Sequence, residues 1–135
     1  MYETFEHTAD LGLRARAADL DTLFGEAAKA LFSTLASLDD VLPRVERRLE
    51  LTGSEIDYLL FDWLSELLYL FDREHLLLCQ FDVAVDEHGL RATVRGEPVD
   101  PARHRLEHEV KAITYHGLRV EQTADGWQSE VIVDI

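Results

Sequence analysis

Cysteine is almost absent from this sequence. The single cysteine, Cys79, cannot form an internal disulfide bond, and one thiolate cannot build a cysteine metal cage. Because Cys79 stands in an apolar run, we expect a buried structural thiol rather than a nucleophile. Long apolar runs are also missing, since no stretch approaches the ~20 residues needed to span a bilayer. The first residues are acidic, unlike a signal peptide, so the sequence predicts a soluble, cytoplasmic protein without a membrane partner.

Basic side chains are scarce. The chain has 13 lysines and arginines against 27 aspartates and glutamates, a net charge of −14, and its only lysines are Lys29 and Lys111. Such a negative field repels phosphate backbones, so direct binding of nucleic acid is not expected. The same field favours cations or a basic protein partner.

Recognisable catalytic arrangements are also missing. No strand-helix unit carries a glycine-rich phosphate loop, and no Ser-His-Asp or Cys-His set can be argued. Asp62 and Glu66 lie one helical turn apart and could act as acid and base, but a solvated helix face explains them equally simply. His104 and His108 would share a helix face and could bind zinc; in the strand expected there they lie ~13 Å apart. The residues by themselves therefore indicate no catalytic residues.

The apolar pattern predicts a single α+β domain over residues 1–135. Helical spacing predicts helices over 20–38, with Asp19 or Asp21 as N-cap, and over 55–72, with a capping box starting at Ser54. Alternation and turn residues predict the strands. These strands cover 13–17, 41–51, 76–85, 90–94, 106–115, 118–121 and 127–135. We expect two helices packed on a largely antiparallel (mixed) sheet.

Oxygen ligands stand at both ends of the sequence. The last apolar strand carries Asp134 and the α-carboxylate of Ile135, and Asp10 stands in a polar turn near the start. One interpretation is a solvated chain end and an Asx turn. If the fold brings the two ends together, three carboxylates form a site for a hard divalent cation such as calcium, magnesium or manganese.

Lys111 attracts attention because lysine is rare here. An expected strand places Lys111 on one face with Glu109 and Tyr115. The lysine could form an ordinary cross-strand ion pair, or reach an acidic or phosphate group on a partner. His7 and His116 each stand beside a turn that bears on function. Each imidazole could have a structural role, contact a partner or bind a metal ion.

Five sequence motifs, in order over essentially the whole chain, resemble one known family. They are His7-Thr8-Ala9-Asp10-Leu11-Gly12, residues 62–72, Gly96-Glu97-Pro98 with residues 100–104, residues 109–117, and Val133-Asp134-Ile135. On these motifs and the agreement in length, the chain resembles archease.

The resemblance implies a non-enzymatic activator of the RtcB-type tRNA-splicing ligase. Such an activator promotes guanylylation of the ligase histidine and multiple turnover in tRNA splicing and RNA repair, and broadens nucleotide use. It implies an archease-type sandwich and a metal site formed by Asp10, Asp134 and Ile135, with calcium as the associated ion. It further assigns Lys111 to the activating surface. Two other functions remain open: a general chaperone or assembly factor, and a stand-alone metal-dependent phosphoesterase.

Overall fold

Two long helices alternate with strands along the chain. The computed structural model describes residues 1–7 and 10–135, with only the backbone of His7. The helices are α1 (Leu20–Leu35) and α2 (Ile56–Glu74), with a short 3-10 helix, η1 (Leu38–Asp40). The strands are β1 (Tyr2–His7), β2 (Asp10–Ala17), β3 (Val45–Thr52), β4 (Leu76–Asp86), β5 (Gly89–Pro98), β6 (Ala112–Ile113), β7 (Arg119–Thr123) and β8 (Gly126–Asp134).

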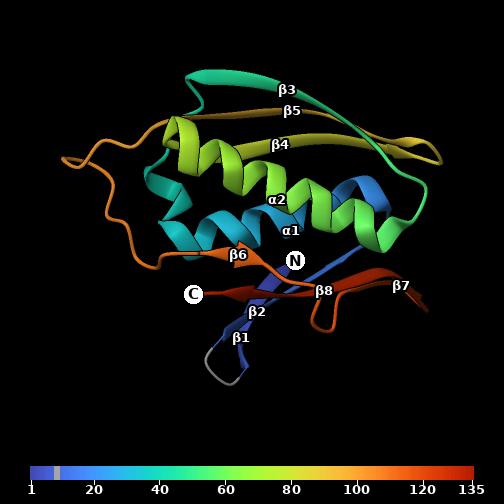
Figure 1. Ribbon diagram of the computed structural model, residues 1–135. Helices are drawn as coiled ribbons and strands as arrows, with labels where there is room; N and C mark the ends of the chain where they lie inside the picture. Colours follow the sequence, from blue (N-terminus) through green and yellow to red (C-terminus); the bar gives the residue numbers. More distant parts are fainter. Residues whose placement is uncertain (8–9) are drawn as a thin grey trace.

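The described strands form two sheets with the helices between them (Figure 1). One sheet has the order β1-β2-β8-β6, with β7 also paired to β8, and the other has the order β3-β5-β4. Every described strand pair is antiparallel. The α+β class with antiparallel strands is thus confirmed, and the second sheet covers the helix faces that the first leaves open. No helix in the described part of the chain is long and apolar enough to cross a membrane.

The core fills both spaces between helices and sheets. Leu13 and Val133 point inward from the first sheet, and Leu77 and Val94 come from the second. Trp63 of α2 is fully buried, and its indole N–H donates a 3.0 Å hydrogen bond to the Phe24 carbonyl of α1. Burial of each large apolar side chain contributes roughly 1.5–3 kcal/mol, so these layers hold the sheets on the helices.

The two helix starts differ. The Asp19 carboxylate accepts a 2.8 Å hydrogen bond from the Thr22 N–H, so its predicted N-cap role is confirmed. The predicted capping box at Ser54 is wrong, because α2 begins after Glu55, which makes no side-chain capping bond. At its other end α2 reaches Glu74 and stops at His75, whose φ of 56° is left-handed.

Two predicted strands are shorter than expected. Residues 41–44 precede β3 as irregular chain, and of residues 106–115 only Ala112–Ile113 joins a sheet. The residues from 106 to 111 instead form a loop that bonds to the end of α1. Here the Glu107 N–H donates to the Leu35 carbonyl at 2.9 Å. Cys79, predicted to be buried, is only half-buried. This partial burial still raises the pKa of its thiol, so the thiolate is disfavoured.

Candidate functional site

Asp10 and Asp134 start and end two neighbouring strands of the five-stranded sheet. β2 and β8 are antiparallel with Leu11 opposite Val133, so continuing this register by one residue brings Asp10 beside Asp134. Side chains alternate along a strand, and Leu13 and Val133 point into the core. The two aspartates therefore share the outer face of the sheet, where neighbouring Cβ atoms are typically about 4.5–5.5 Å apart.

Both aspartates are half-buried. Two carboxylates ~4 Å apart repel by roughly 4 kcal/mol at an effective dielectric constant of ~20, so a nearby cation would stabilise them. Among the side chains that the structure describes, which exclude that of His7, no three His, Cys, Asp or Glu form a metal-binding cluster. A complete site would therefore need the predicted α-carboxylate of Ile135, whose side chain packs against the core.

β6 lies on the other side of Asp134. Ala112 pairs with Asp134, and the Lys111 N–H donates a 2.7 Å hydrogen bond to the Asp134 carbonyl. The Lys111 side chain is exposed and forms no ion pair with a residue that the structure describes. The ordinary cross-strand ion pair is thus not formed among the described residues. The backbone of Lys111 therefore adjoins Asp134 at the end of β8.

The other predicted contact residues lie around this segment. Glu109 and His116 are exposed, and the Tyr115 ring stacks on Phe61 of α2 at 4.0 Å between centroids. Because β6 contains only two residues, regular alternation does not place Glu109, Lys111 and Tyr115 on a strand face. The side chain of His7, with Thr8 and Ala9, lies outside the described residues, so its predicted contact stays a prediction.

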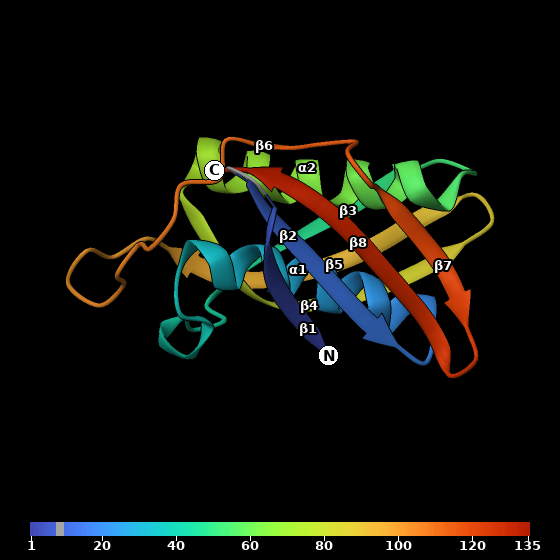
Figure 2. The ribbon, with the colours of Figure 1, turned by 90° about the horizontal axis from the view of Figure 1, so that it is seen from below.

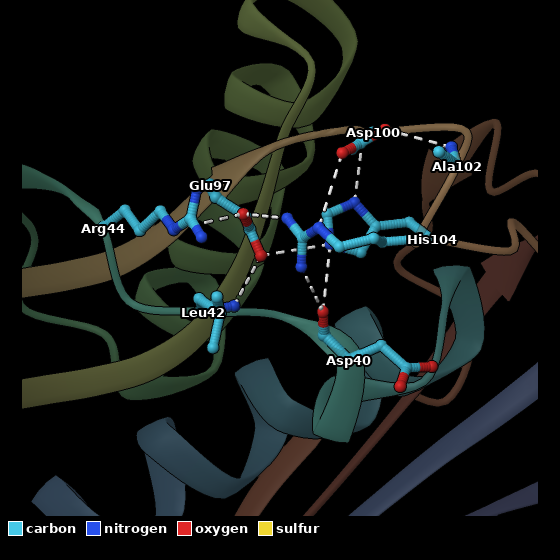
Figure 3. A network of polar contacts seen from close by, with 8 residues as sticks. Asp40, Leu42, Arg44, Glu97, Asp100, Ala102 and His104 are labelled. Atoms are coloured by element: carbon cyan, nitrogen blue, oxygen red, sulfur yellow. Dashed lines mark hydrogen bonds and ion pairs between the residues drawn. The ribbon is translucent and has the colours of Figure 1, made fainter.

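A second polar cluster lies where β5 ends (Figure 3). The Glu97 side chain is only 3% exposed, and its carboxylate contacts Arg103, the Leu42 N–H at 2.6 Å and the His104 Nε2 at 3.1 Å. Arg44 approaches the same carboxylate at 3.8 Å. The hydrogen bond from Arg103 is the largest of the effects that lower the pKa of Glu97 to about 2, against the opposing effect of burial. Glu97 is therefore a buried carboxylate anion.

The hydrogen bonds of His104 define its tautomer. The Asp100 N–H donates to His104 Nδ1 at 2.8 Å, so Nδ1 carries no proton in this arrangement. Nε2 then carries the proton and faces the Asp40 carbonyl at 3.0 Å as well as Glu97. The zinc interpretation of His104 and His108 is wrong, because both His104 nitrogens are already engaged and His108 is exposed on the loop.

This cluster was not predicted as a structural unit. Glu97 follows a glycine and precedes a proline, which indicates a loop, and loops usually expose their charged residues. The available signal was the cluster of charged and imidazole residues just after the strand. Pairing across more than fifty residues, from Leu42 to Glu97, cannot be derived from spacing.

A surface hollow lies away from both clusters, on the three-stranded sheet. It has a volume of about 580 Å³, and its lining includes Arg48, Glu50 and Arg91 but no His, Cys or Ser. Glu50 and Arg91 already approach each other at 4.0 Å. The Asp62 and Glu66 pair lies on α2, outside the hollow, where Asp62 is exposed.

The protein is thus an α+β sandwich. Two acidic residues, Asp10 of β2 and Asp134 of β8, lie at one end of its five-stranded sheet. The family model described as "Archease protein family (MTH1598/TM1083)" matches residues 2–135. The chain belongs to the archease family.

Similar proteins cover nearly the whole chain. "Protein archease" of Methanopyrus kandleri is 41% identical over 138 residues, which cover 99% of this chain and of that protein. The Methanosarcina mazei "Protein archease" is 39% identical, covering 99% of this chain and 95% of its own length.

Two solved structures share the fold. The solution structure of Methanobacterium thermoautotrophicum protein 1598 has a TM-score of 0.88 and 35% identity, covering 99% of this chain and 98% of the other. The crystal structure of a Thermotoga maritima archease, described as a possible chaperone, has a TM-score of 0.60 and 20% identity, covering 100% and 98%. At this identity the second similarity concerns the fold alone.

Proposed function

We propose that the chain is a non-enzymatic activator of an RtcB-type RNA ligase in tRNA splicing and RNA repair. It binds the ligase, promotes guanylylation of the ligase histidine and multiple turnover, and broadens the range of accepted nucleotides. Family membership supports this proposal. The observation that carries it is the β2–β8 register, because this pairing brings Asp10 and Asp134 onto one outer face at the end of the sheet.

A carboxylate metal site is part of this proposal. Asp10, Asp134 and the α-carboxylate of Ile135 would hold a divalent cation, with calcium preferred and magnesium or manganese as alternatives. All three donors are oxygen atoms, and oxygen donors select hard cations. When bound, the cation would add positive charge at the surface that meets the ligase and its nucleotide.

The chain's own residues bind and orient the partner. The backbone of Lys111 adjoins Asp134 and its side chain is exposed, so its ammonium group would be able to reach a phosphate or carboxylate of the ligase complex. Glu109, Tyr115, His116 and His7 would surround this contact. The net charge of −14 would steer the protein toward the basic surface of an RNA-binding partner and away from RNA itself. A transient interface suffices for an activator that leaves before RNA ends enter.

A ligase-turnover assay tests the proposal. We would compare the wild type, Asp10→Ala and a variant with a short extension after Ile135. Asp125→Ala serves as control, because Asp125 is exposed in the turn at the opposite end of β8. We expect the control to stimulate turnover like the wild type and the other two variants to lose stimulation. Full stimulation by the extended variant would contradict the terminal-carboxylate ligand, and no stimulation by the wild type would contradict the function.

A chaperone role is the second candidate. The Thermotoga maritima archease, which shares this fold, is described as a possible chaperone. A general chaperone would suppress aggregation of unrelated unfolded proteins, and Asp10→Ala should not alter that activity. Suppression of citrate synthase aggregation by wild type and Asp10→Ala alike, without ligase stimulation, would favour this second function.

A further inference from the structure

A long loop connects β5 to the segment that carries Lys111. It spans residues 99–111 and contains neither a helix nor a strand of either sheet. Figures 1 and 2 place this loop at the same end of the molecule as the carboxyl terminus. A free loop of this length would give Lys111 a wide range of positions. The structure instead attaches the loop at three places.

The first attachment is the buried cluster around Glu97. His104 turns back onto the start of the loop, since its Nδ1 accepts from the Asp100 N–H and its Nε2 faces Glu97 (Figure 3). Arg103 binds the same carboxylate and lies 3.4 Å from the Asp100 carboxylate. The Leu42 N–H joins this arrangement to the chain before β3. The loop therefore leaves β5 in one direction.

The second attachment joins the loop to the end of α1, and the third consists of Val110 and Lys111 near the end of β8. Leu106 forms an isolated bridge with Ala36, and the His108 N–H donates to the Thr34 carbonyl of α1 at 3.3 Å. Val110 is buried in the core. The Lys111 N–H then bonds to the Asp134 carbonyl. Each attachment limits the path to the next one.

Stability alone is a weak explanation of the first attachment. Replacing a buried ion pair by apolar side chains of similar volume is often neutral or stabilising, so such a pair is weak evidence for a stability role. A fixed hydrogen-bond geometry, by contrast, defines the direction in which the chain proceeds. Glu97 and His104 are almost fully covered, so neither side chain offers a contact surface to a partner.

We infer that Glu97 and His104 are positioning residues that fix the 99–111 loop and thereby hold Lys111 beside Asp134. The inference rests on the proposed function, in which Lys111 acts on the ligase. It adds residues that touch neither the ligase nor the cation. The cluster would control the maximal stimulation reached with the partner, through the placement of the ammonium group.

Amide hydrogen exchange tests the structural half without any partner. We would measure the Lys111 amide by NMR in Glu97→Gln, which removes the carboxylate charge, and in Arg103→Gln, a milder change because Arg103 is partly exposed. We expect exchange of the Lys111 amide to accelerate by about tenfold or more, with the Val94 amide of β5 unchanged. His104→Asn keeps an acceptor for the Asp100 N–H and should give a smaller effect. Unchanged Lys111 exchange in a folded Arg103→Gln protein would overturn the inference.

A double-mutant cycle in the ligase assay tests the functional half. If the cluster acts through Lys111, Glu97→Gln added to Lys111→Ala should cause no further loss of maximal stimulation. Two independent effects would instead multiply, and this result would overturn the inference. Normal stimulation by a folded Glu97→Gln or Arg103→Gln protein would overturn it as well. Glu46→Gln is the control, because Glu46 is exposed and pairs with Arg95 and Arg48, outside the Glu97 cluster. Failure of the wild type to stimulate would instead contradict the proposed function itself, and the exchange data would still report on the loop.

Discussion

The backbone N–H of Lys111 donates a 2.7 Å hydrogen bond to the carbonyl oxygen of Asp134. Through this bond, the segment before β6 meets the end of β8, while β2 flanks β8 on its other side. Asp134 thus lies between the lysine-bearing segment and the strand that begins at Asp10. Three residues that are far apart in the sequence come together at one end of one sheet.

The carboxylate pair should determine the affinity for divalent ions. We expect Asp10→Asn and Asp134→Asn each to weaken calcium binding by about tenfold or more, because each change removes one anionic oxygen ligand. Isothermal titration calorimetry with calcium and manganese measures this effect. Asp125→Asn, at the far end of β8, should retain wild-type affinity. Equal affinity in all four proteins would show that the ion binds elsewhere.

Acid should weaken the fold partly through Glu97. Its pKa is lowered from 4.5 to about 2 in the folded protein, so the unfolded state binds this proton more readily. The stabilisation from Glu97 is therefore complete above about pH 4.5 and is lost as the pH falls toward about 2. Urea unfolding of Glu97→Gln should show its largest deficit near neutral pH, shrinking across that range.

A destabilised protein without a change in charge is the matched control for this pH series. Leu90 is buried in β5, and Leu90→Ala should lower the free energy of unfolding by about 2–5 kcal/mol at every pH. Its pH profile should run parallel to that of the wild type. If Glu97→Gln also runs parallel, the Glu97 carboxylate is not the group that titrates.

Gly12 gives a packing prediction close to the candidate metal centre. Phe5 pairs with Gly12 across β1 and β2, and a Cβ on Gly12 would lie 2.2 Å from the Phe5 ring. Arg14 covers the same ring at 4.5 Å, so the ring has little freedom to move. Gly12→Ala should therefore cost about 1–3 kcal/mol in urea unfolding. Adding Phe5→Ala should remove most of the clash. If the changes in unfolding free energy are strictly additive in the double variant, there is no clash between the two residues.

The starts of the two helices offer a paired test of capping. Asp19 accepts the Thr22 N–H, and this bond lowers the pKa of its carboxyl group, whereas Glu55 makes no capping bond. Asp19→Ala should cost roughly 0.5–2 kcal/mol in thermal or urea unfolding, and Glu55→Ala should stay within about 0.5 kcal/mol. Equal losses of stability in both variants would indicate that helix propensity, rather than the capping bond of Asp19, determines the loss.

Sequence pattern was sufficient where neighbouring residues determine the structure. Helical spacing located both helices within a few residues, and Asp19 was correctly proposed as a cap. The alternation in residues 106–115 was misleading, because a loop bonded to the end of α1 can have the same pattern as a strand. The Glu97 cluster depends on contacts from Leu42 and His104 that only the folded chain creates. The neighbouring position of Asp10 and Asp134 could be suggested from the chain ends, but their register required the fold.

β8 is the last strand in the sequence, yet it lies inside the five-stranded sheet with partners on both sides. During translation the β1–β2 hairpin leaves the ribosome long before its inner neighbour is made. Until then the helix faces that pack on this sheet lack part of their cover, and assembly of the sheet must wait for β8. A chain halted before β8 would therefore expose apolar core residues, and such exposure favours aggregation.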